Sequence, residues 1–140
     1  MMYLLDTCVI SELVALKPSQ LLTSWILQQN EDTFYVSVLT VGELRRGIFG
    51  LPKSAKKDRL AAWFESEFLE RFSRRVIPVD IDVAIAWGEL IAAAAKRGRP
   101  LPSIDSLILA SALTRKASIV TRNVKDFEGL GVEVVNPWSA

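Results

Sequence analysis

The sequence contains no histidine and a single cysteine, Cys8, and these two shortages exclude several common kinds of site. Without histidine, the chain cannot form a Ser-His-Asp triad, a Cys-His dyad or a zinc site with His ligands. With one cysteine, it cannot form an internal disulfide framework or a cysteine-rich zinc site. If the protein is an enzyme, its chemistry must come from carboxylates, hydroxyls, amines and hard metal ions.

The sequence also lacks an excess of charge of either sign and a long apolar run. Its 17 basic and 16 acidic residues leave a net charge of +1, so nucleic-acid binding would need a local basic patch. The longest apolar stretch, residues 83–95, is interrupted by Glu89 and is too short to span a membrane. The first residues show no basic segment followed by an apolar run, the pattern of a signal peptide. We therefore expect a soluble cytoplasmic protein.

Half of the 140 residues are hydrophobic, which is enough for a core, and predicted strands alternate with predicted helices along the chain. Apolar, β-branched or aromatic runs predict strands at residues 3–5, 34–36, 76–79, 118–121 and 132–135. Amphipathic patterning predicts helices at residues 10–16, 21–29, 37–49, 55–72, 81–96 and 103–115. With no hairpin signal of the Asn-Gly type, this order predicts a parallel sheet covered on both faces, in one α/β domain over residues 1–140.

Four acidic residues follow or adjoin these predicted elements. Asp6 follows the first strand, Glu43 lies in the helix after the second, and Asp126 follows the fourth. Asp105 lies in the first turn of a helix that Ser103 would cap. Functional groups of doubly wound sheets gather at the carboxyl ends of the strands, so these acids are candidates for one site. Taken singly, each also has a structural interpretation as a turn residue, a helix-dipole partner or a solvated surface acid.

Taken together, the four acids favour a metal site. Carboxylates that converge repel one another, and a bound divalent cation removes that repulsion. Mg²⁺ and Mn²⁺ prefer oxygen ligands, so carboxylates with supporting Asn and Thr oxygens suit them. In a chain without histidine, such a site fits phosphodiester hydrolysis, in which the metal activates water and stabilises charge on the phosphate.

The acids lie in four motifs that, in this order, resemble those of PIN-domain proteins. The motifs read LLDTCVISE at residues 4–12, SVLTVGELRRG at 37–47, IDSLILASA at 104–112 and VTRNVKDF at 120–127. A tail that reads VVNPW at residues 134–138 is typical of the VapC subgroup, the toxins of type II toxin–antitoxin pairs, and especially of its FitB-like branch. Each motif is weak alone, but the four in register with the tail give a strong resemblance over residues 3–138.

The resemblance implies a three-layer α/β/α PIN-like domain with a central, mostly parallel sheet of about five strands. It also implies a Mg²⁺- or Mn²⁺-dependent endoribonuclease whose acidic metal ligands are Asp6, Glu43 and Asp105. The fourth position departs from the family pattern, because Asn123 stands where many relatives have Asp. Either Asn123 serves as a neutral ligand or water anchor, or Asp126 supplies the fourth charge. We favour Asp126 as the fourth catalytic acid and metal ligand, with Asn123 in support.

Hydroxyl groups near the acids would form supporting contacts. By the same resemblance, Thr7, Ser37 and Thr121 would orient the carboxylates. Cys8 stands where Asn or Ser is usual, and we interpret its thiol as a small packing group and not as a nucleophile.

A basic segment follows the Glu43 motif. Residues 45–59 hold six bases and one acid, a local net charge of +5 that could hold RNA phosphates beside the metal site. The candidate RNA-binding residues are Arg45, Arg46 and Lys53 from this segment, and Arg122 beside the fourth strand. An ordinary solvated helix start and loop accounts for the same segment equally well.

Large apolar side chains are more numerous in the first two predicted helices and in residues 55–72 than a small monomer needs. Each could belong to the core, but as a set they suggest a groove between helices for a partner protein. The set is Trp25, Ile26, Leu60, Trp63, Phe64 and Phe68. The resemblance implies that this groove takes the C-terminal segment of a cognate antitoxin, that the toxin forms a homodimer within the complex, and that the antitoxin reads any DNA.

Other classes of protein are alternatives. Haloacid-dehalogenase-like phosphatases also begin with a strand and Asp, but they need a second acid two residues later, where this chain has Cys8. A response-regulator receiver would need an acidic pair before the first strand, and the chain has none there. A PIN-like scaffold that acts only by binding its partner stays open because of Asn123, although the presence of Asp6, Glu43 and Asp105 argues against a decayed site.

Overall fold

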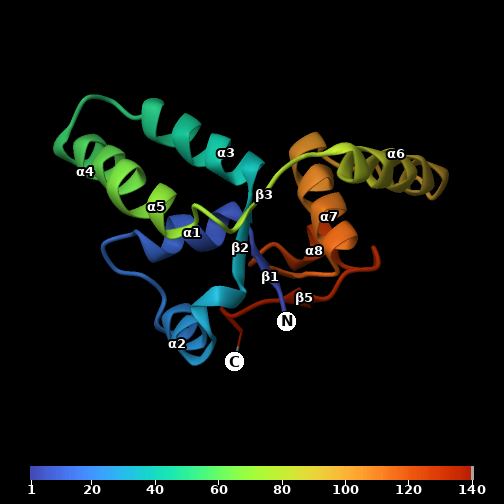
Figure 1. The fold of residues 1–140 in the computed structure, drawn as a ribbon, viewed down its shortest axis with the longest axis horizontal. Helices are drawn as coiled ribbons and strands as arrows, with labels where there is room; N and C mark the ends of the chain where they lie inside the picture. Colours follow the sequence, from blue (N-terminus) through green and yellow to red (C-terminus); the bar gives the residue numbers. More distant parts are fainter. Residues whose placement is uncertain (140) are drawn as a thin grey trace.

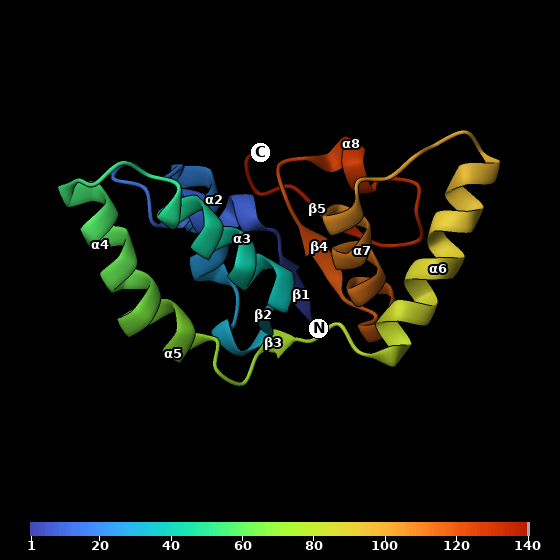
Figure 2. The same cartoon turned by 90° about the horizontal axis from the view of Figure 1, so that it is seen from above.

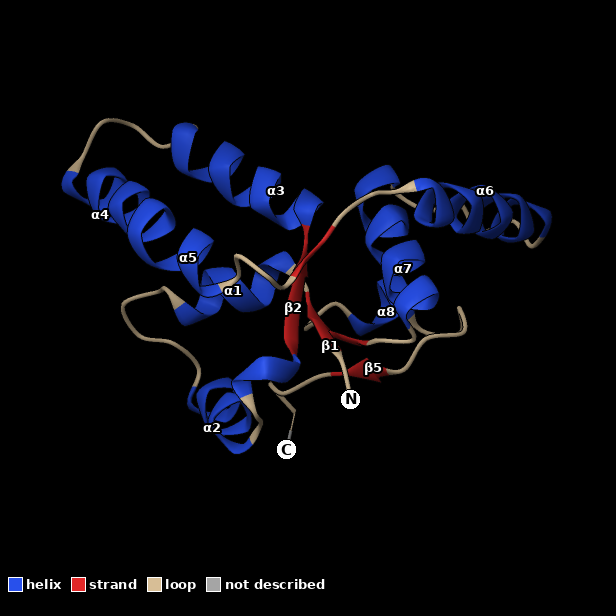
Figure 3. Cartoon of the chain, in the orientation of Figure 1, coloured by secondary structure: helices blue, strands red, loops and turns tan. Residues whose placement is uncertain are grey.

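The computed structural model describes residues 1–139, and at its centre lies a sheet of five parallel strands (Figures 1 and 3). The strands are β1 (Tyr3–Leu5), β2 (Phe34–Ser37), β3 (Val76–Ile77), β4 (Ser118–Val120) and β5 (Val134–Val135). Their order across the sheet is β3-β2-β1-β4-β5, so β1 occupies the centre and every neighbouring pair is parallel. The predicted parallel sheet is confirmed.

Helices cover both faces of this sheet. They are α1 (Thr7–Leu13), α2 (Gln20–Gln28), α3 (Val38–Phe49), α4 (Ala55–Trp63), α5 (Leu69–Arg71), α6 (Ile81–Lys96), α7 (Ser103–Arg115) and α8 (Val124–Phe127), with a 3-10 turn at Glu31–Thr33 and a π turn at Phe64–Phe68. Figure 2 shows α2 to α5 on one side of the strands and α6 and α7 on the other. The predicted three-layer α/β/α architecture is thereby confirmed. No helix within residues 1–139 has both the length and the apolar character needed to cross a membrane.

The strands separate two apolar cores because successive side chains of a strand point to opposite faces. In β1, Leu5 packs with residues of α1, α2 and α3, whereas its neighbour Leu4 packs with residues of α7. The same alternation places Val120 of β4 in the first core and Ile119 in the second. Strands that are apolar at successive positions therefore suit a sheet buried on both faces.

Residues 55–72 form a less regular arm than the single helix that the sequence predicts. The π turn interrupts α-helical geometry between α4 and α5, and Ser66 Oγ donates a 2.7 Å hydrogen bond to the carbonyl of Ala62 there. Along this arm Phe64, Phe68 and Phe72 are all buried, with successive ring centres 5.5 and 5.4 Å apart. The wider turn accompanies a continuous aromatic row that attaches the arm to the sheet.

The starts of two other helices differ from the prediction, one in its position and one in its capping residue. The first starts at Thr7, three residues earlier than predicted, because the carboxylate of Asp6 accepts a 2.9 Å hydrogen bond from the Thr7 N–H and caps the helix. The second, α7, has Ser103 as its first residue and Pro102 at the cap position, so Ser103 is not the cap that the sequence predicts. An acidic residue lies at each of these helix starts, because Asp6 caps α1 and Asp105 is in the first turn of α7.

Candidate active site

Asp6 is the most rigidly held acid of the predicted set. It directly follows the central strand and is only 6% exposed. Besides the Thr7 N–H, its carboxylate accepts a 2.8 Å hydrogen bond from the hydroxyl of Thr121, at the end of β4, and has the thiol of Cys8 at 3.7 Å. These contacts fix the orientation of the carboxylate at the carboxyl ends of the two central strands.

Glu43 approaches Asp6 through Thr7. Glu43 lies on α3, the helix that directly follows β2, and its Oε1 accepts a 2.6 Å hydrogen bond from the Thr7 hydroxyl. The hydroxyl of Thr40, one turn earlier on the same helix, lies 3.3 Å from that of Thr7. Thr7 therefore contacts two of the acids, Asp6 through its backbone and Glu43 through its side chain.

Asp105 lies in the first turn of α7, where it is half-buried. Within residues 1–139, no hydrogen bond or ion pair reaches its carboxylate. Its pKa is raised to about 6, first because burial removes water from the charged form, and then because Asp6, Asp126 and Glu43 bring negative charge close to it. The structure thus brings the four predicted acids into one electrostatic cluster, although they come from four separate parts of the chain.

Asp126 reaches the cluster on α8, a single helical turn that the sequence analysis did not predict. It is exposed. Asn123 occupies the cap position of this turn, where its backbone N–H donates a 3.0 Å hydrogen bond to Thr121 Oγ1 but its exposed side chain caps nothing. An Asn followed three residues later by an acid is a helix-start signal that could have revealed α8.

The supporting hydroxyls divide into two kinds. Thr7 and Thr121 donate hydrogen bonds to Glu43 and Asp6, as described above. Ser37 is fully buried, and its hydroxyl accepts a 3.1 Å hydrogen bond from the N–H of Leu39, so it caps the helix that carries Glu43. Burial, and secondarily the nearby charge of Asp6, raise the pKa of the Cys8 thiol, which suits a packing group better than a nucleophile.

The candidate RNA-binding residues lie in different environments. Arg45 pairs with Glu65 at 3.4 Å, and its guanidinium lies over the ring of Phe49 at 4.4 Å, so it is directed towards the neighbouring helices. Arg46 and Lys53 are exposed and form no ion pair within residues 1–139. The α-helical rise places the end of α3 about 9 Å beyond Glu43, so Lys53 is farther from the acids than Arg46. Arg122 is exposed, and its guanidinium lies 5.1 Å from the centre of the Trp138 ring.

The acidic cluster is open and not a closed metal cage. Within residues 1–139, no three Asp, Glu or Cys side chains are gathered into a ready-made metal site. The donor chemistry nevertheless fits a hard divalent cation, because all four groups supply carboxylate oxygens and Asp105 has acidic neighbours without a basic one. Side-chain movements would therefore be needed to close the carboxylates around one ion.

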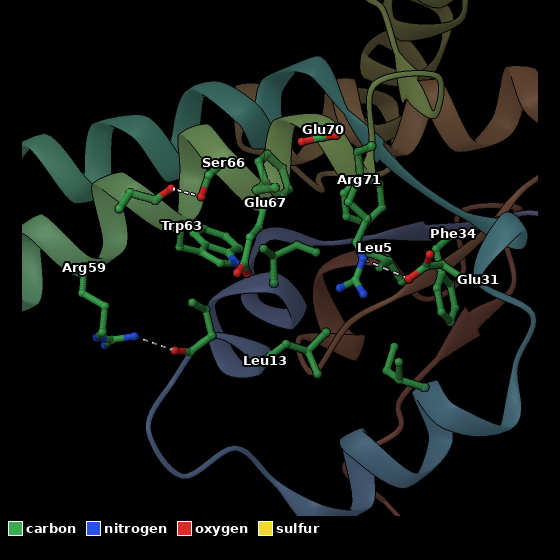
Figure 4. A pocket seen from close by; sticks show the side chains of 16 residues that line it. Leu5, Leu13, Glu31, Phe34, Arg59, Trp63, Ser66, Glu67, Glu70 and Arg71 are labelled. Atoms are coloured by element: carbon green, nitrogen blue, oxygen red, sulfur yellow. Dashed lines mark hydrogen bonds and ion pairs between the residues drawn. The ribbon is translucent and has the colours of Figure 1, made fainter.

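A separate groove lies between α1, α2 and the arm formed by α4, the π turn and α5 (Figure 4). It has a volume of about 1070 Å³, and its walls combine apolar Leu13, Ile26 and Trp63 with charged Glu67. Of the six predicted partner-binding residues, Ile26, Trp63 and Phe68 line this groove. Leu60 lines an adjoining pocket of about 290 Å³. The other two lie elsewhere, because Trp25 packs edge-on against Tyr3 and Phe64 is in the core. The predicted groove therefore exists, with half of the predicted residues in its walls.

Known proteins are similar to this chain in sequence and fold over nearly their whole length. The PIN domain family matches residues 3–131. The chain is 34% identical to the VapC ribonuclease Y4jK of Sinorhizobium fredii over 98% of both chains, and 33% identical to the toxin FitB of Neisseria gonorrhoeae over 98% of this chain and 99% of FitB. It is similar, with a TM-score of 0.93 and 32% identity, to a chain in the crystal structure of FitAcB from Neisseria gonorrhoeae, with 99% of this chain and 100% of that chain covered.

Proposed function

Because the chain belongs to the PIN-domain family, we propose that it is a Mg²⁺- or Mn²⁺-dependent endoribonuclease that acts as the toxin of a type II toxin–antitoxin pair. The resemblance predicted from four motifs and a tail is confirmed by the family match and by the relatives. A ribonuclease and a toxin, each more than 30% identical over nearly the full length, support both parts of the proposal.

The observation that carries the proposal is the unpaired Asp105 carboxylate among three other acids. Asp6, Glu43, Asp105 and Asp126 would hold the ion. Bound there, a divalent cation supplies an activated water and stabilises negative charge on the phosphate. Thr121 and Thr7 hold two of the carboxylates in place by hydrogen bonds, and Asn123 keeps the turn after β4 attached to Thr121.

Basic residues around the cluster would bind the RNA backbone. Arg46 lies one turn after Glu43 on α3, and Arg122 directly follows Thr121, so both flank the acids. We propose that Arg45 and Lys53 also bind the RNA backbone. The contacts of Arg45 with Glu65 and Phe49 restrict how far its side chain can reach towards RNA. Phosphate contacts of this kind position RNA without reading its sequence. Action on RNA would place the protein in the cytoplasm.

The groove in Figure 4 suits the antitoxin. Its apolar wall residues Leu13, Ile26 and Trp63 would bury the apolar side of a peptide segment, and Glu67 and Arg59 offer charges of both signs at its rim. A segment bound there would lie against α1, the helix that Asp6 caps. We further propose a homodimer within the toxin–antitoxin complex and leave DNA binding to the antitoxin.

The test is cleavage of a mixed RNA pool by antitoxin-free protein with Mg²⁺, Mn²⁺ or EDTA. Asp105→Asn is the sharpest inactive variant, because the Asp105 carboxylate makes no hydrogen bond within residues 1–139 whose loss would disturb the fold. Asp6→Asn is a weaker choice, since Asp6 also caps α1 and accepts from Thr121. We expect metal-dependent cleavage by the wild type and none by Asp105→Asn. Folded wild-type protein that binds its antitoxin but cuts no RNA would favour a binding-only scaffold instead.

A further inference from the structure

A basic side chain outside the acidic cluster holds the short helix that carries Asp126. Arg99 lies in the loop between α6 and α7, and its guanidinium reaches the end of α8. Nη1 donates a hydrogen bond to the carbonyl of Glu128 and Nη2 donates one to the carbonyl of Lys125, each at 2.9 Å. One side chain thus satisfies two backbone acceptors at the carboxyl end of α8.

The backbone of Arg99 is itself fixed by the end of α6. Gly98 has a positive φ of 69° and donates its N–H to the carbonyl of Ala95. The N–H of Arg99 donates a 2.9 Å hydrogen bond to the carbonyl of Ala94. This pair of bonds is the Schellman arrangement that terminates many helices. Pro100 follows directly and restricts the conformation of Arg99 further. The guanidinium therefore extends from an anchored position.

The helix that Arg99 contacts is weak without it. At four residues, α8 has little intrinsic stability, and no side chain caps its first turn. Of its residues only Phe127 is buried. The loop that contains Arg99 also leads directly into α7 and Asp105, so the two hydrogen bonds connect the segments that carry two of the four acids.

We propose that Arg99 is a positioning residue that sets the place of Asp126 in the acidic cluster by clamping the end of α8. The proposal rests on the proposed function, in which Asp126 is one of the metal ligands. Arginine suits this task because its planar guanidinium can donate to two separate carbonyls at once, from two nitrogens. The donors of lysine all lie on one nitrogen atom.

The first measurement is the affinity of the metal-free protein for Mn²⁺ alone, by calorimetric titration. We expect Arg99→Ala to weaken Mn²⁺ binding about 10-fold, the lower end for loss of a contact that supports a metal ligand. Arg97→Ala is the matched control, because the Arg97 side chain is exposed and makes no hydrogen bond or ion pair within residues 1–139. Arg99→Lys should fall between wild type and Arg99→Ala.

A second background separates positioning from a general loss of stability. In Asp126→Asn protein, Arg99→Ala should cause no further loss of Mn²⁺ affinity, because the group that Arg99 positions is already neutral. Equal losses in both backgrounds, or wild-type affinity in Arg99→Ala, would overturn the proposal.

Hydrogen–deuterium exchange gives a readout that needs neither metal nor RNA. Residues 124–128 should exchange faster in Arg99→Ala than in Arg97→Ala, with little change in the central strands. Unchanged exchange there would also contradict the clamp. Protein that binds Mn²⁺ in the Arg99-dependent way but cuts no RNA would contradict the proposed function and leave the role of Arg99 intact.

Discussion

The Thr7 hydroxyl donates a 2.6 Å hydrogen bond to the Glu43 carboxylate, and this contact joins the first residue of α1 to α3, the helix that follows the neighbouring strand β2. The same residue donates its backbone N–H to Asp6. One threonine therefore fixes the separation of two acids that lie far apart in the sequence. Its side-chain contact can be removed while its backbone contact remains.

Thr7→Val should lower metal-dependent cleavage about 10-fold, because valine has nearly the same shape but cannot hold Glu43. Thr7→Ser, which keeps the hydroxyl, should retain most of the activity. The measurement is kcat/KM on one RNA substrate at a fixed Mn²⁺ concentration, with melting temperatures as a check on folding. Equal activity of the valine and serine variants would show that the hydrogen bond has no part in catalysis.

Asp105→Asn should stabilise the metal-free protein while it abolishes cleavage. The pKa of Asp105 is about 6 in the folded protein, above its ordinary value of 3.8, so folding disfavours its charged form. That destabilisation is absent below about pH 4, grows as the pH rises towards 6 and is constant above it. After allowance for the partial exposure of Asp105, we expect about 1 kcal/mol at pH 7.5, or about 2–4 °C in Tm.

Thermal unfolding in EDTA at pH 7.5 and pH 4 checks this sign. The rise in Tm caused by Asp105→Asn should be present at pH 7.5 and nearly absent at pH 4, where protonation of the wild-type carboxyl removes most of its charge in the folded protein. Glu43→Gln is a useful comparison, since the Glu43 carboxylate has a hydrogen-bond donor in Thr7, whereas the Asp105 carboxylate has none within residues 1–139. Destabilisation by Asp105→Asn at pH 7.5 would argue against mutual repulsion in the cluster.

Metal binding should weaken as the pH falls below 6. A proton and a cation compete for the Asp105 carboxylate, whose pKa of about 6 means that the proton prevails in acid. The apparent Kd for Mn²⁺ should therefore rise about fivefold between pH 6 and pH 5 and change little between pH 7 and pH 8. Titrations of the wild-type protein at these four pH values give the profile. A flat profile across them would exclude Asp105 as the controlling group.

Arg46→Glu should weaken RNA binding most strongly at low salt, because the contact is electrostatic. RNA binding is measured by fluorescence anisotropy at two salt concentrations, with the Asp105→Asn substitution also present so that the RNA is not cleaved. Lys96→Glu makes the same change of charge at the exposed end of α6, on the other side of the sheet, and should have little effect. Similar losses in both variants would indicate a response to net charge and not to a local contact.

The fold and most of the acidic set could be predicted from local patterns. Asp6, Glu43 and Asp105 each adjoin an element with a clear apolar pattern, and parallel strands bring such residues to one edge of a sheet. Asp126 could be proposed from its place after the fourth strand and from a resemblance, but not from a helix, because the helix that carries it is a single turn with one buried residue. Short elements of this kind depend on tertiary contacts and leave little periodicity in the sequence.

Contacts between distant side chains and backbone groups were beyond prediction. Arg45 counts as one more base in a basic segment, yet it pairs with Glu65 twenty residues later and stacks on Phe49. Arg99 binds two backbone carbonyls, and a carbonyl carries no sequence signal. Charge composition therefore identifies a basic segment but cannot say which of its members are free to meet RNA.

Ile26→Asp should weaken antitoxin binding while RNA cleavage is retained. Ile26 lies in the apolar wall of the groove in Figure 4, and a carboxylate there would have to lose water without a partner when an antitoxin segment binds. Leu27→Asp is the matched control, because the side chain of Leu27, the next residue in the sequence, is 79% exposed and does not line the groove. We expect at least a tenfold loss of affinity for Ile26→Asp and wild-type affinity for Leu27→Asp, measured by titrating purified cognate antitoxin into the ribonuclease assay. Weaker inhibition of Leu27→Asp than of Ile26→Asp would move the antitoxin to the outer face of α2.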